Sequence, residues 1–265
     1  MIASLPMYLA GGNAVQTFWN ALSGLLAQRL GRDTQETLAW PQDLFAHWLE
    51  PQLLLSQTCG YPLSTALRNK VQVLGTFAYD APGAHGIYCR SQLIRKSADT
   101  RSTLAEFAGS TLAYNSSDSQ SGFNALRALV TRSQTQRPFF SGSVETGGHN
   151  ASIEAVRCGQ ADMASIDCVT FAIWRDAQPE LAKDIAVFGE TADYPGLPLI
   201  TSLTTPPETL AALRACLASV ATDAQFAAVR APLRITGFEI TTLTDYDICL
   251  QMEKAGVPMF NTPAA

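Results

Sequence analysis

The sequence predicts an α/β protein made of two lobes, each a mostly parallel sheet flanked by helices, joined by a two-strand hinge. Short apolar runs alternate with helical patterns along nearly all of the 265 residues, which is typical of a parallel sheet covered by helices. Two stretches rich in turn residues, YDAPGAHG at 79–86 and YPGLP at 194–198, stand between predicted strands. We therefore expect 1–84 and 194–265 to form the first lobe, and 85–193 the second.

Apolar runs bounded by turn residues predict the strands, and apolar spacings of three and four predict the helices. The first helix is predicted from the helical spacing of its apolar residues, which are Val15, Phe18, Trp19, Leu22, Leu25, Leu26 and Leu30. The predicted strands cover 1–5, 52–57, 71–77, 86–94, 110–114, 139–144, 163–166, 185–190 and 197–202. The predicted helices cover 15–30, 103–107, 121–132 and 150–158, with others beginning after Gln57 and near 167, 206, 223 and 244.

Composition and charge narrow the classes of function. Hydrophobic residues make up 47% and charged residues 15% of the chain, and the net charge is −5. This balance is ordinary for an α/β protein and argues against nucleic acid or an anionic membrane as a partner. No run approaches the roughly 18 apolar residues of a membrane helix. No signal peptide is visible at the N-terminus, so we expect either a cytoplasmic chain or one whose leader has been removed.

Six cysteines and three histidines argue against a zinc site, because no two cysteines have CxxC spacing. We expect no metal and no cofactor. A chain of this length does not depend on disulfides, and we interpret the cysteines as buried free thiols. The four tryptophans have helical spacing and are interpreted as core residues.

The stretch YNSSDSQSG at 114–122 places several small hydroxyl and amide side chains at one strand-to-helix junction. Ser, Asp and Asn are preferred helix caps, and a turn with a cap explains the stretch when it is considered alone. One cap accounts for only one residue. The free N–H groups of a helix start, together with the hydroxyls of Ser119 and Ser121, would also suit a tetrahedral oxyanion.

Two further junctions have similar chemistry. In VETGGHNAS at 144–152, the glycines allow a close approach and His149 can donate to an oxyanion. In SIDC at 165–168, Asp167 directly follows a buried strand. Helix capping explains the second and third junctions when each is taken alone. As a ligand residue, Asp167 would repel a fully ionised anion and favour a ligand that carries an O–H, P–H or ammonium group.

In the first lobe, Tyr8 follows the first strand, and Thr58 and Tyr61 follow the second. Packing at the lobe edge is the commoner role of such tyrosines. All five junctions nevertheless fall at strand ends, where open α/β sheets bind ligands. The sequence shows no G-x-S-x-G elbow, phosphate loop, dinucleotide motif or nucleophile–base pair. We therefore expect a binding site with no catalytic residues.

Four segments resemble the phosphate/phosphite/phosphonate-binding proteins of ABC transporters: GTFAYDAPGAHGIYCRS, AYNSSDSQSGFNALRAL, TGGHNASIEAVRCGQADMASIDCVTF and GLPLITSL. The resemblance covers most of the chain and is strongest over 76–203. It implies the two-lobed fold of type II periplasmic binding proteins, with the ligand cleft between the lobes. It also implies an ABC permease as partner and a periplasmic location.

The resemblance also implies roles for particular residues. The family's three hydroxyl residues that hold the phosphoryl oxygens match Ser119, Gln120 and Ser121, so that an amide replaces the middle hydroxyl. The family's histidine matches His149, and Asn150 stands in place of the acid that follows it. These two differences bear on the choice of ligand more than on the fold.

Asp167 matches the family's aspartate that meets the P–H, O–H or amine side of the ligand, and Tyr8, Thr58 and Tyr61 match contacts of the first lobe. We therefore expect a monomeric solute-binding protein, not an enzyme, that captures a phosphonate, phosphite or phosphate for an ABC transporter. Two alternatives remain open. One is a cytoplasmic ligand sensor of the same fold, and the other is an enzyme or binder of a small heteroaromatic molecule or organic acid.

Overall fold

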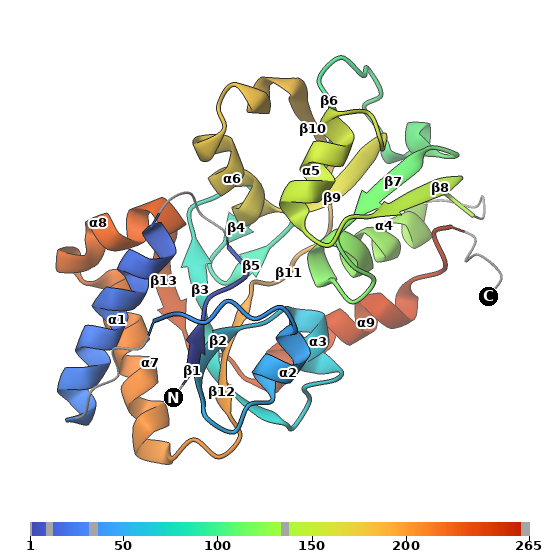
Figure 1. The fold of residues 1–265 in the computed structure, drawn as a ribbon. Coiled ribbons are helices and arrows are strands. Elements are labelled where there is room, and N and C mark those ends of the chain that lie inside the picture. The colour runs from blue at the N-terminus through green and yellow to red at the C-terminus, as the bar shows by residue number, and fades with distance from the viewer. Residues whose placement is uncertain (1, 9–12, 32–36, 134–137, 261–265) are drawn as a thin grey trace. The chain divides into compact units, whose positions relative to one another are not determined.

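The computed structural model describes residues 2–8, 13–31, 37–133 and 138–260 (Figure 1). The chain divides into two compact units. Unit 1 runs up to Tyr88 and continues from Pro195 to Asp247. Unit 2 runs from Cys89 to Tyr194 and includes the segment from Ile248 onward. Both units are therefore built from stretches that are far apart in the sequence.

Unit 1 is built on a five-stranded mixed sheet. In spatial order its strands are β1 (Ile2–Ser4), β2 (Leu53–Gln57), β12 (Pro198–Ser202), β3 (Val71–Tyr79) and β13 (Ile235–Glu239). β1 and β2 pair in parallel, while β12 pairs antiparallel with both β2 and β3. β1, β2 and β3 thus share one direction. Every residue of β2 and β12 is buried, because other elements cover both faces of the sheet.

The helices of unit 1 are α1 (Ala14–Leu30), α2 (Leu44–Trp48), α3 (Gly60–Ser64), α7 (Pro207–Thr222) and α8 (Ala227–Arg230). α1 and α7 pack against each other (Figure 1). The Phe18 ring of α1 meets the Phe77 ring of β3 edge-on, with 5.7 Å between centroids. This contact fastens the apolar stripe of α1 to the sheet, as the helical spacing predicts.

Unit 2 is also built on a five-stranded mixed sheet. In spatial order its strands are β10 (Ile185–Glu190), β6 (Ser91–Lys96), β9 (Met163–Asp167), β7 (Thr111–Tyr114) and β8 (Gly142–Glu145). β7 pairs in parallel with β8 and β9, and β6 pairs antiparallel with β9 and β10. All of these strands except β6 share one direction. Its helices are α4 (Ala125–Ser133), α5 (His149–Arg157), α6 (Cys168–Ala177) and, from Ile248 on, α9 (Asp247–Ala255).

Two apolar clusters cover the two faces of the unit 2 sheet. Consecutive residues divide between them: Leu112 belongs to one cluster and Ala113 to the other. Met163 and Ala164 divide in the same way. This alternation follows from the two-residue period of a strand. The carboxyl ends of β7, β8 and β9 therefore project from a sheet that is packed on both sides.

The chain passes between the units within two short strands. β5 (Tyr88–Cys89) and β11 (Tyr194–Pro195) are neighbours in a small sheet that also contains β4 (Ala84–His85). Unit 1 ends and unit 2 begins inside β5, and the reverse change occurs inside β11. The chain changes units a third time at the start of α9, between Asp247 and Ile248. The predicted two-lobed α/β fold is confirmed.

The prediction of one strand over 86–94 is wrong, because the ladder breaks between β5 and β6. Arg90 stands at this break, and its guanidinium contacts Asp193 at 2.6 Å and Glu190 at 3.3 Å. A second strand starts later than predicted: β8 begins at Gly142, and Phe139 and Phe140 before it are buried in the core. An apolar run alone does not distinguish a strand from a packed loop.

The placement of the C-terminal segment in the first lobe is also wrong. Described residues from Ile248 on belong to unit 2. Nη2 of Arg127 donates to the carbonyl of Glu253 at 2.8 Å, and the backbone N–H of Phe140 donates to the carbonyl of Met259 at 2.8 Å. These contacts dock the segment on the α4 side of unit 2.

Two expectations about burial need correction. Five of the six free cysteines are buried, but Cys158 is exposed. Trp19 and Trp48 lie in the core, whereas Trp40 is 53% exposed and does not belong to it.

Within the described ranges, no helix is long and apolar enough to span a membrane. The same residues contain no cluster of His, Cys, Asp and Glu suited to a metal ion.

Candidate functional site

The junction after β7 begins with a wide helical turn. Residues Gln120–Asn124 form a π-helix that continues into α4. Ser119 is its cap: Oγ accepts from the N–H of Gly122 at 3.0 Å, while its carbonyl accepts from the N–H of Asn124 at 3.0 Å. Such wide turns recur at functional sites. Because Ser119 Oγ is an acceptor in this bond, its own proton stays available to a ligand.

The structure brings the first and second junctions into direct contact. Ser121 Oγ lies 2.9 Å from Nε2 of His149, the first residue of α5. The carbonyl of Ser121 accepts hydrogen bonds at 2.8 Å from the hydroxyls of both Ser91 and Ser165. Ser91 Oγ in turn lies 2.7 Å from the hydroxyl of Tyr194. Buried hydroxyls from β6 and β9 thus fix the backbone that carries Ser121.

His149 is a neutral group at pH 7. Burial lowers the pKa of its imidazole from 6.5 to about 4, because removal from water disfavours the charged form. The residue as a whole is half-buried, but its Nδ1 atom is fully buried and has no hydrogen-bond partner among the described residues. A buried polar atom without a partner is uncommon in proteins. Nδ1 of His149 can therefore still form one hydrogen bond.

Gly122 gives this junction its close packing. An ideal Cβ on Gly122 would lie 1.9 Å from Oδ1 of Asn115 and 3.3 Å from Cε1 of His149. No side chain fits at that position unless these neighbours move. Oδ1 of Asn115 and Nδ2 of Asn124 are also buried without hydrogen-bond partners in the described part of the chain. Donors and acceptors thus gather at one helix start in unit 2.

Gln120 has a different environment from the two serines beside it. Its side chain is 1% exposed, and Nε2 donates to the sulfur of Met252 at 3.0 Å. Met252 belongs to α9. The amide that replaces the family's middle hydroxyl is therefore packed against the C-terminal segment.

Asp167 caps the third junction, as capping preference suggests. It ends β9, is 4% exposed, and its Oδ1 accepts from the N–H of Thr170 at 2.8 Å. Desolvation first, and then the charge of Asp167, raise the pKa of the buried Tyr194 well above its usual value. In the β6–β9 ladder Asp167 is opposite Ser91, whose hydroxyl donates to Ser121. Asp167 therefore belongs to the same polar layer of unit 2.

In unit 1, Tyr8 lies in the loop after β1, Thr58 directly follows β2, and Tyr61 lies at the start of α3. Tyr8 is buried and its ring meets that of Tyr79 edge-on at 5.3 Å. Thr58 is fully buried, and its Oγ1 has no partner among the described residues. Tyr61 lies in α3 and is half-buried.

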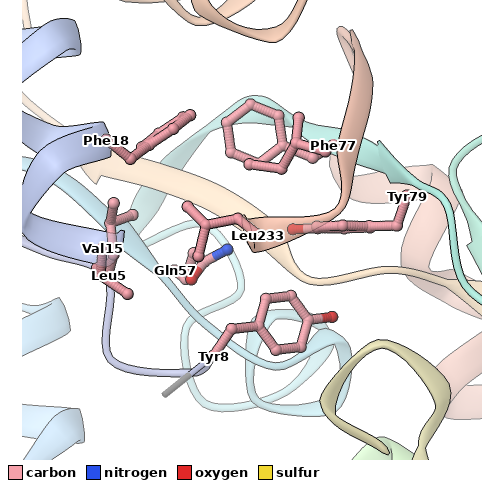
Figure 2. Close-up of a pocket in the computed structure, with 9 residues that line it drawn as sticks. Leu5, Tyr8, Val15, Phe18, Gln57, Phe77, Tyr79 and Leu233 are labelled. Atoms are coloured by element: carbon pink, nitrogen blue, oxygen red, sulfur yellow. The ribbon is translucent and has the colours of Figure 1, made fainter. Parts of the chain in front are cut away.

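Figure 2 shows a small cavity in unit 1 that Tyr8, Gln57 and Phe77 help to line. The Gln57 amide points into it between mostly apolar side chains. Its volume is about 20 Å³, which is room for about one water molecule. This cavity by itself is too small to hold an organic ligand.

The sequence did not reveal the pair formed by Ser121 and His149, because 28 positions separate them. It also missed Ser91, Ser165 and Asn115, which line or support the junction. A signal for one of these was present: Ser165 is a polar residue inside the buried strand MASID, whereas Ser91 opens the more polar strand SQLIRK. Buried hydroxyls in such strands need a partner, and here they share the carbonyl of Ser121.

A Ser–His pair also raises the question of nucleophilic catalysis. In hydrolases, a third group orients the histidine by accepting from its other ring nitrogen. That nitrogen, Nδ1, has no such partner in the part of the chain that the structure describes. Among these residues, the pair therefore lacks the orienting group of a hydrolase triad.

The chain matches the model of a family described as ABC transporter, phosphonate, periplasmic substrate-binding protein, over residues 12–246. The comparison with curated proteins gave no match. Among solved structures, a binding-protein component of an ABC phosphonate transporter from Pseudomonas aeruginosa is similar, with a TM-score of 0.75 and 18% identity. That alignment covers 95% of this chain and 85% of the other.

Two further structures agree in fold. PhnD1 from Prochlorococcus marinus, in complex with methylphosphonate, aligns with a TM-score of 0.73 and 11% identity over 96% of this chain and 97% of that one. A Xanthomonas citri protein bound to chloride ion aligns with a TM-score of 0.70 and 13% identity over 96% of both chains. At these identities the structures show the fold, and the family model shows the relationship. The chain therefore belongs to the phosphonate family of periplasmic substrate-binding proteins of ABC transporters, and its role is to bind a solute, not to catalyse a reaction.

Proposed function

We propose that unit 2 holds the phosphoryl group of a small phosphorus oxyanion, a phosphonate above all, at the start of the helix that begins with Gln120. The observation that carries the proposal is the Ser121–His149 pair at 2.9 Å, beside Gly122, where a side chain would clash with Asn115. The family description names phosphonate, and PhnD1 of the same fold holds methylphosphonate. Both support this ligand class.

The hydrogen-bonding capacity of the junction suits such an anion. Ser119 accepts from the backbone, so its hydroxyl can donate to a phosphoryl oxygen. The first N–H groups of a helix have no partner within the helix, and they favour negative charge. Neutral donors of this kind bind an oxyanion without a cationic side chain.

His149 then selects the protonation state of the ligand. In the tautomer with the proton on Nε2, the imidazole donates to Ser121 Oγ, and the Ser121 hydroxyl is free to donate to the ligand. Nδ1 is then an acceptor, and it suits a phosphoryl group that still carries one O–H. Asp167, buried in the same polar layer, likewise disfavours a fully ionised ligand. We infer that the bound species is a monoanion.

The other predicted contacts enter as part of the proposal. In unit 2, Gln120 contributes to the site through its backbone and packing. In unit 1, Tyr8, Thr58 and Tyr61 are proposed ligand contacts, supported by the buried Oγ1 of Thr58 that has no partner among the described residues. We also propose that the protein is a monomer that works in the periplasm and delivers its ligand to an ABC permease. The family description supports the location and the transporter.

Calorimetric titration with methylphosphonate, phosphite, phosphate and a small organic acid tests this proposal. We expect heat from at least one phosphorus oxyanion and none from the organic acid. Ser121→Ala should weaken binding by about 10- to 100-fold, since hydrogen bonds to charged groups contribute about 1.5–3 kcal/mol. Ser117→Ala, on the exposed part of the same loop, is the matched control and should bind normally. Folded protein that gives heat only with the organic acid would contradict the proposal.

A further inference from the structure

A buried chain of hydrogen bonds connects strand β11 to the helix start that carries Ser121. Tyr194 lies on β11 and is the last residue of unit 2 before the chain returns to unit 1. Its hydroxyl lies 2.7 Å from Ser91 Oγ, and Ser91 Oγ donates to the Ser121 carbonyl at 2.8 Å. All three residues are buried. The whole chain therefore lies inside unit 2 and is shielded from water.

The number of protons fixes the direction of this chain. A serine hydroxyl has one proton, and that of Ser91 goes to the Ser121 carbonyl, which can only accept. Tyr194 must therefore donate to Ser91 Oγ. Desolvation first, and then the charge of Asp167, raise the pKa of Tyr194 well above its usual value, so the tyrosine keeps its proton. Because successive hydrogen bonds polarise one another, the bond from Tyr194 strengthens the bond from Ser91 to Ser121.

The strand register explains why Ser91 reaches this helix start. Leu93 is opposite Ser165 in the antiparallel β6–β9 ladder, and Ser91 precedes Leu93 by two residues. Opposite residues, and residues two apart on one strand, lie on the same face of a sheet. Leu93 belongs to the apolar cluster that contains Leu126 of α4. Ser91 and Ser165 therefore also face the α4 side, where each donates to the Ser121 carbonyl.

The segment that leads into β11 holds the backbone of Ser91 as well as its hydroxyl. The N–H of Ser91 donates to Thr191 Oγ1 at 2.9 Å, and the N–H of Thr191 donates to the Ser91 carbonyl at 3.0 Å. Thr191 precedes Tyr194 by only three residues. Ser165, the other donor to Ser121, lies inside β9 and is held by the sheet. A displacement of β11 would thus reach Ser121 through Ser91.

We propose that Tyr194 is a positioning residue of the ligand site, which acts through Ser91 on the Ser121 carbonyl and makes ligand affinity depend on strand β11. The proposal rests on the proposed function, in which Ser121 binds the ligand. A shift of the Ser121 carbonyl also moves its hydroxyl relative to Nε2 of His149, which is 2.9 Å away. Since β11 is a strand in which the chain passes between the units, the junction binds tightly only while this crossing holds Tyr194 in place.

Amide hydrogen exchange of the ligand-free protein tests the hydrogen-bond chain itself. In Tyr194→Phe, the amides of residues 119–124 should exchange about 3- to 10-fold faster than in the wild type, which corresponds to the loss of one hydrogen bond. Those of α5 should not change. Tyr88→Phe removes the hydroxyl of an exposed tyrosine on the neighbouring strand β5, and as the matched control it should behave as the wild type. Unchanged exchange over 119–124, or an equal increase in α5, would overturn the proposal.

Calorimetric titration with methylphosphonate tests the effect on binding. Tyr194→Phe and Ser91→Ala should each weaken binding by about 3- to 10-fold, and Tyr88→Phe should bind normally. The double variant Tyr194→Phe/Ser91→Ala should bind as weakly as Ser91→Ala alone, because the tyrosine acts only through Ser91. Effects that multiply in the double variant, or wild-type affinity in Tyr194→Phe, would overturn the positioning role.

The two experiments separate this proposal from the proposed function. No heat from the wild type with any phosphorus oxyanion would contradict the proposed function. The exchange experiment needs no ligand, and its result would still decide whether Tyr194 holds the Ser121 helix start.

Discussion

Gly122→Ala is expected to disrupt the helix start of unit 2 with a single methyl group. The new Cβ would lie 1.9 Å from Oδ1 of Asn115, so the oxygen must retreat by about 1.5 Å to reach an ordinary contact distance. The same Cβ would lie 3.3 Å from Cε1 of His149, which is a tight contact. The amide of Asn115 must therefore rotate, and it rotates beside the imidazole that pairs with Ser121.

The expected effect on stability is small and the effect on binding is large. Overpacking costs about 1–3 kcal/mol, while Gly→Ala in a helix gains about 1 kcal/mol, so unfolding should change by no more than about 2 kcal/mol. Phosphonate affinity should fall at least about 10-fold, since the displaced groups are those that shape the proposed site. Chemical denaturation and calorimetric titration measure the two effects separately.

Gly148→Ala is the matched control. Gly148 is the residue that precedes α5 at the second helix start of unit 2. A Cβ at Gly148 meets no atom within 4 Å, and its φ of −170° is ordinary extended backbone. This variant should bind normally. The double variant Gly122→Ala/Asn115→Ala removes the clashing amide and should recover part of the lost affinity. Wild-type binding by Gly122→Ala alone, or no recovery in the double variant, would refute the steric reasoning.

Three further predictions concern the polar layer of unit 2. His149 has a folded pKa of about 4 and an unfolded value of 6.5, so the unfolded chain takes up its proton first as the pH falls. The free energy of unfolding should therefore drop between pH 7 and pH 5 by about 2 kcal/mol more in the wild type than in His149→Gln. Denaturant titrations at both pH values measure this difference. An equal drop in the two proteins would contradict the burial of a neutral imidazole. Ser165→Ala removes one of two hydroxyl donors to the Ser121 carbonyl, and should destabilise unit 2 by about 0.5–1.5 kcal/mol in thermal unfolding. Asp167→Asn should reduce the preference for protonated or amine-bearing phosphonates in competition titrations, and an unchanged preference would remove that role from Asp167.

The fold could be predicted from the sequence because local patterns specify most of its elements. The apolar stripe of α1 and the fully buried runs of β2 and β12 follow directly from periodicity. β13 was missed because its sequence, ITGFE, is short and interrupted by Gly237. The C-terminal segment was assigned to the wrong unit because only the long-range contact between Arg127 and Glu253 shows where it packs.

The candidate site was predictable in type but not in geometry. Cap-rich residues after parallel strands predict a ligand site, and the structure places Ser119, Ser121 and His149 at helix starts of unit 2. The sequence cannot show how a side chain is oriented. Gln120 is a polar residue of the kind expected to bind a ligand, yet its amide nitrogen contacts Met252. The contribution of Gly122 is likewise visible only once Asn115 is known to lie against it.

The three crossings between the units constrain the order in which the chain can fold during synthesis. Residues from Cys89 to Tyr194 leave the ribosome as one continuous block, and they hold every strand of the unit 2 sheet. Unit 1 must wait for β12 and β13, and unit 2 must wait for the segment from Ile248 to cover α4. Neither core is therefore complete when the other begins to form. A nascent chain released before α9 would leave Gln120 and Arg127 without their partners and should be a target for chaperones or proteases.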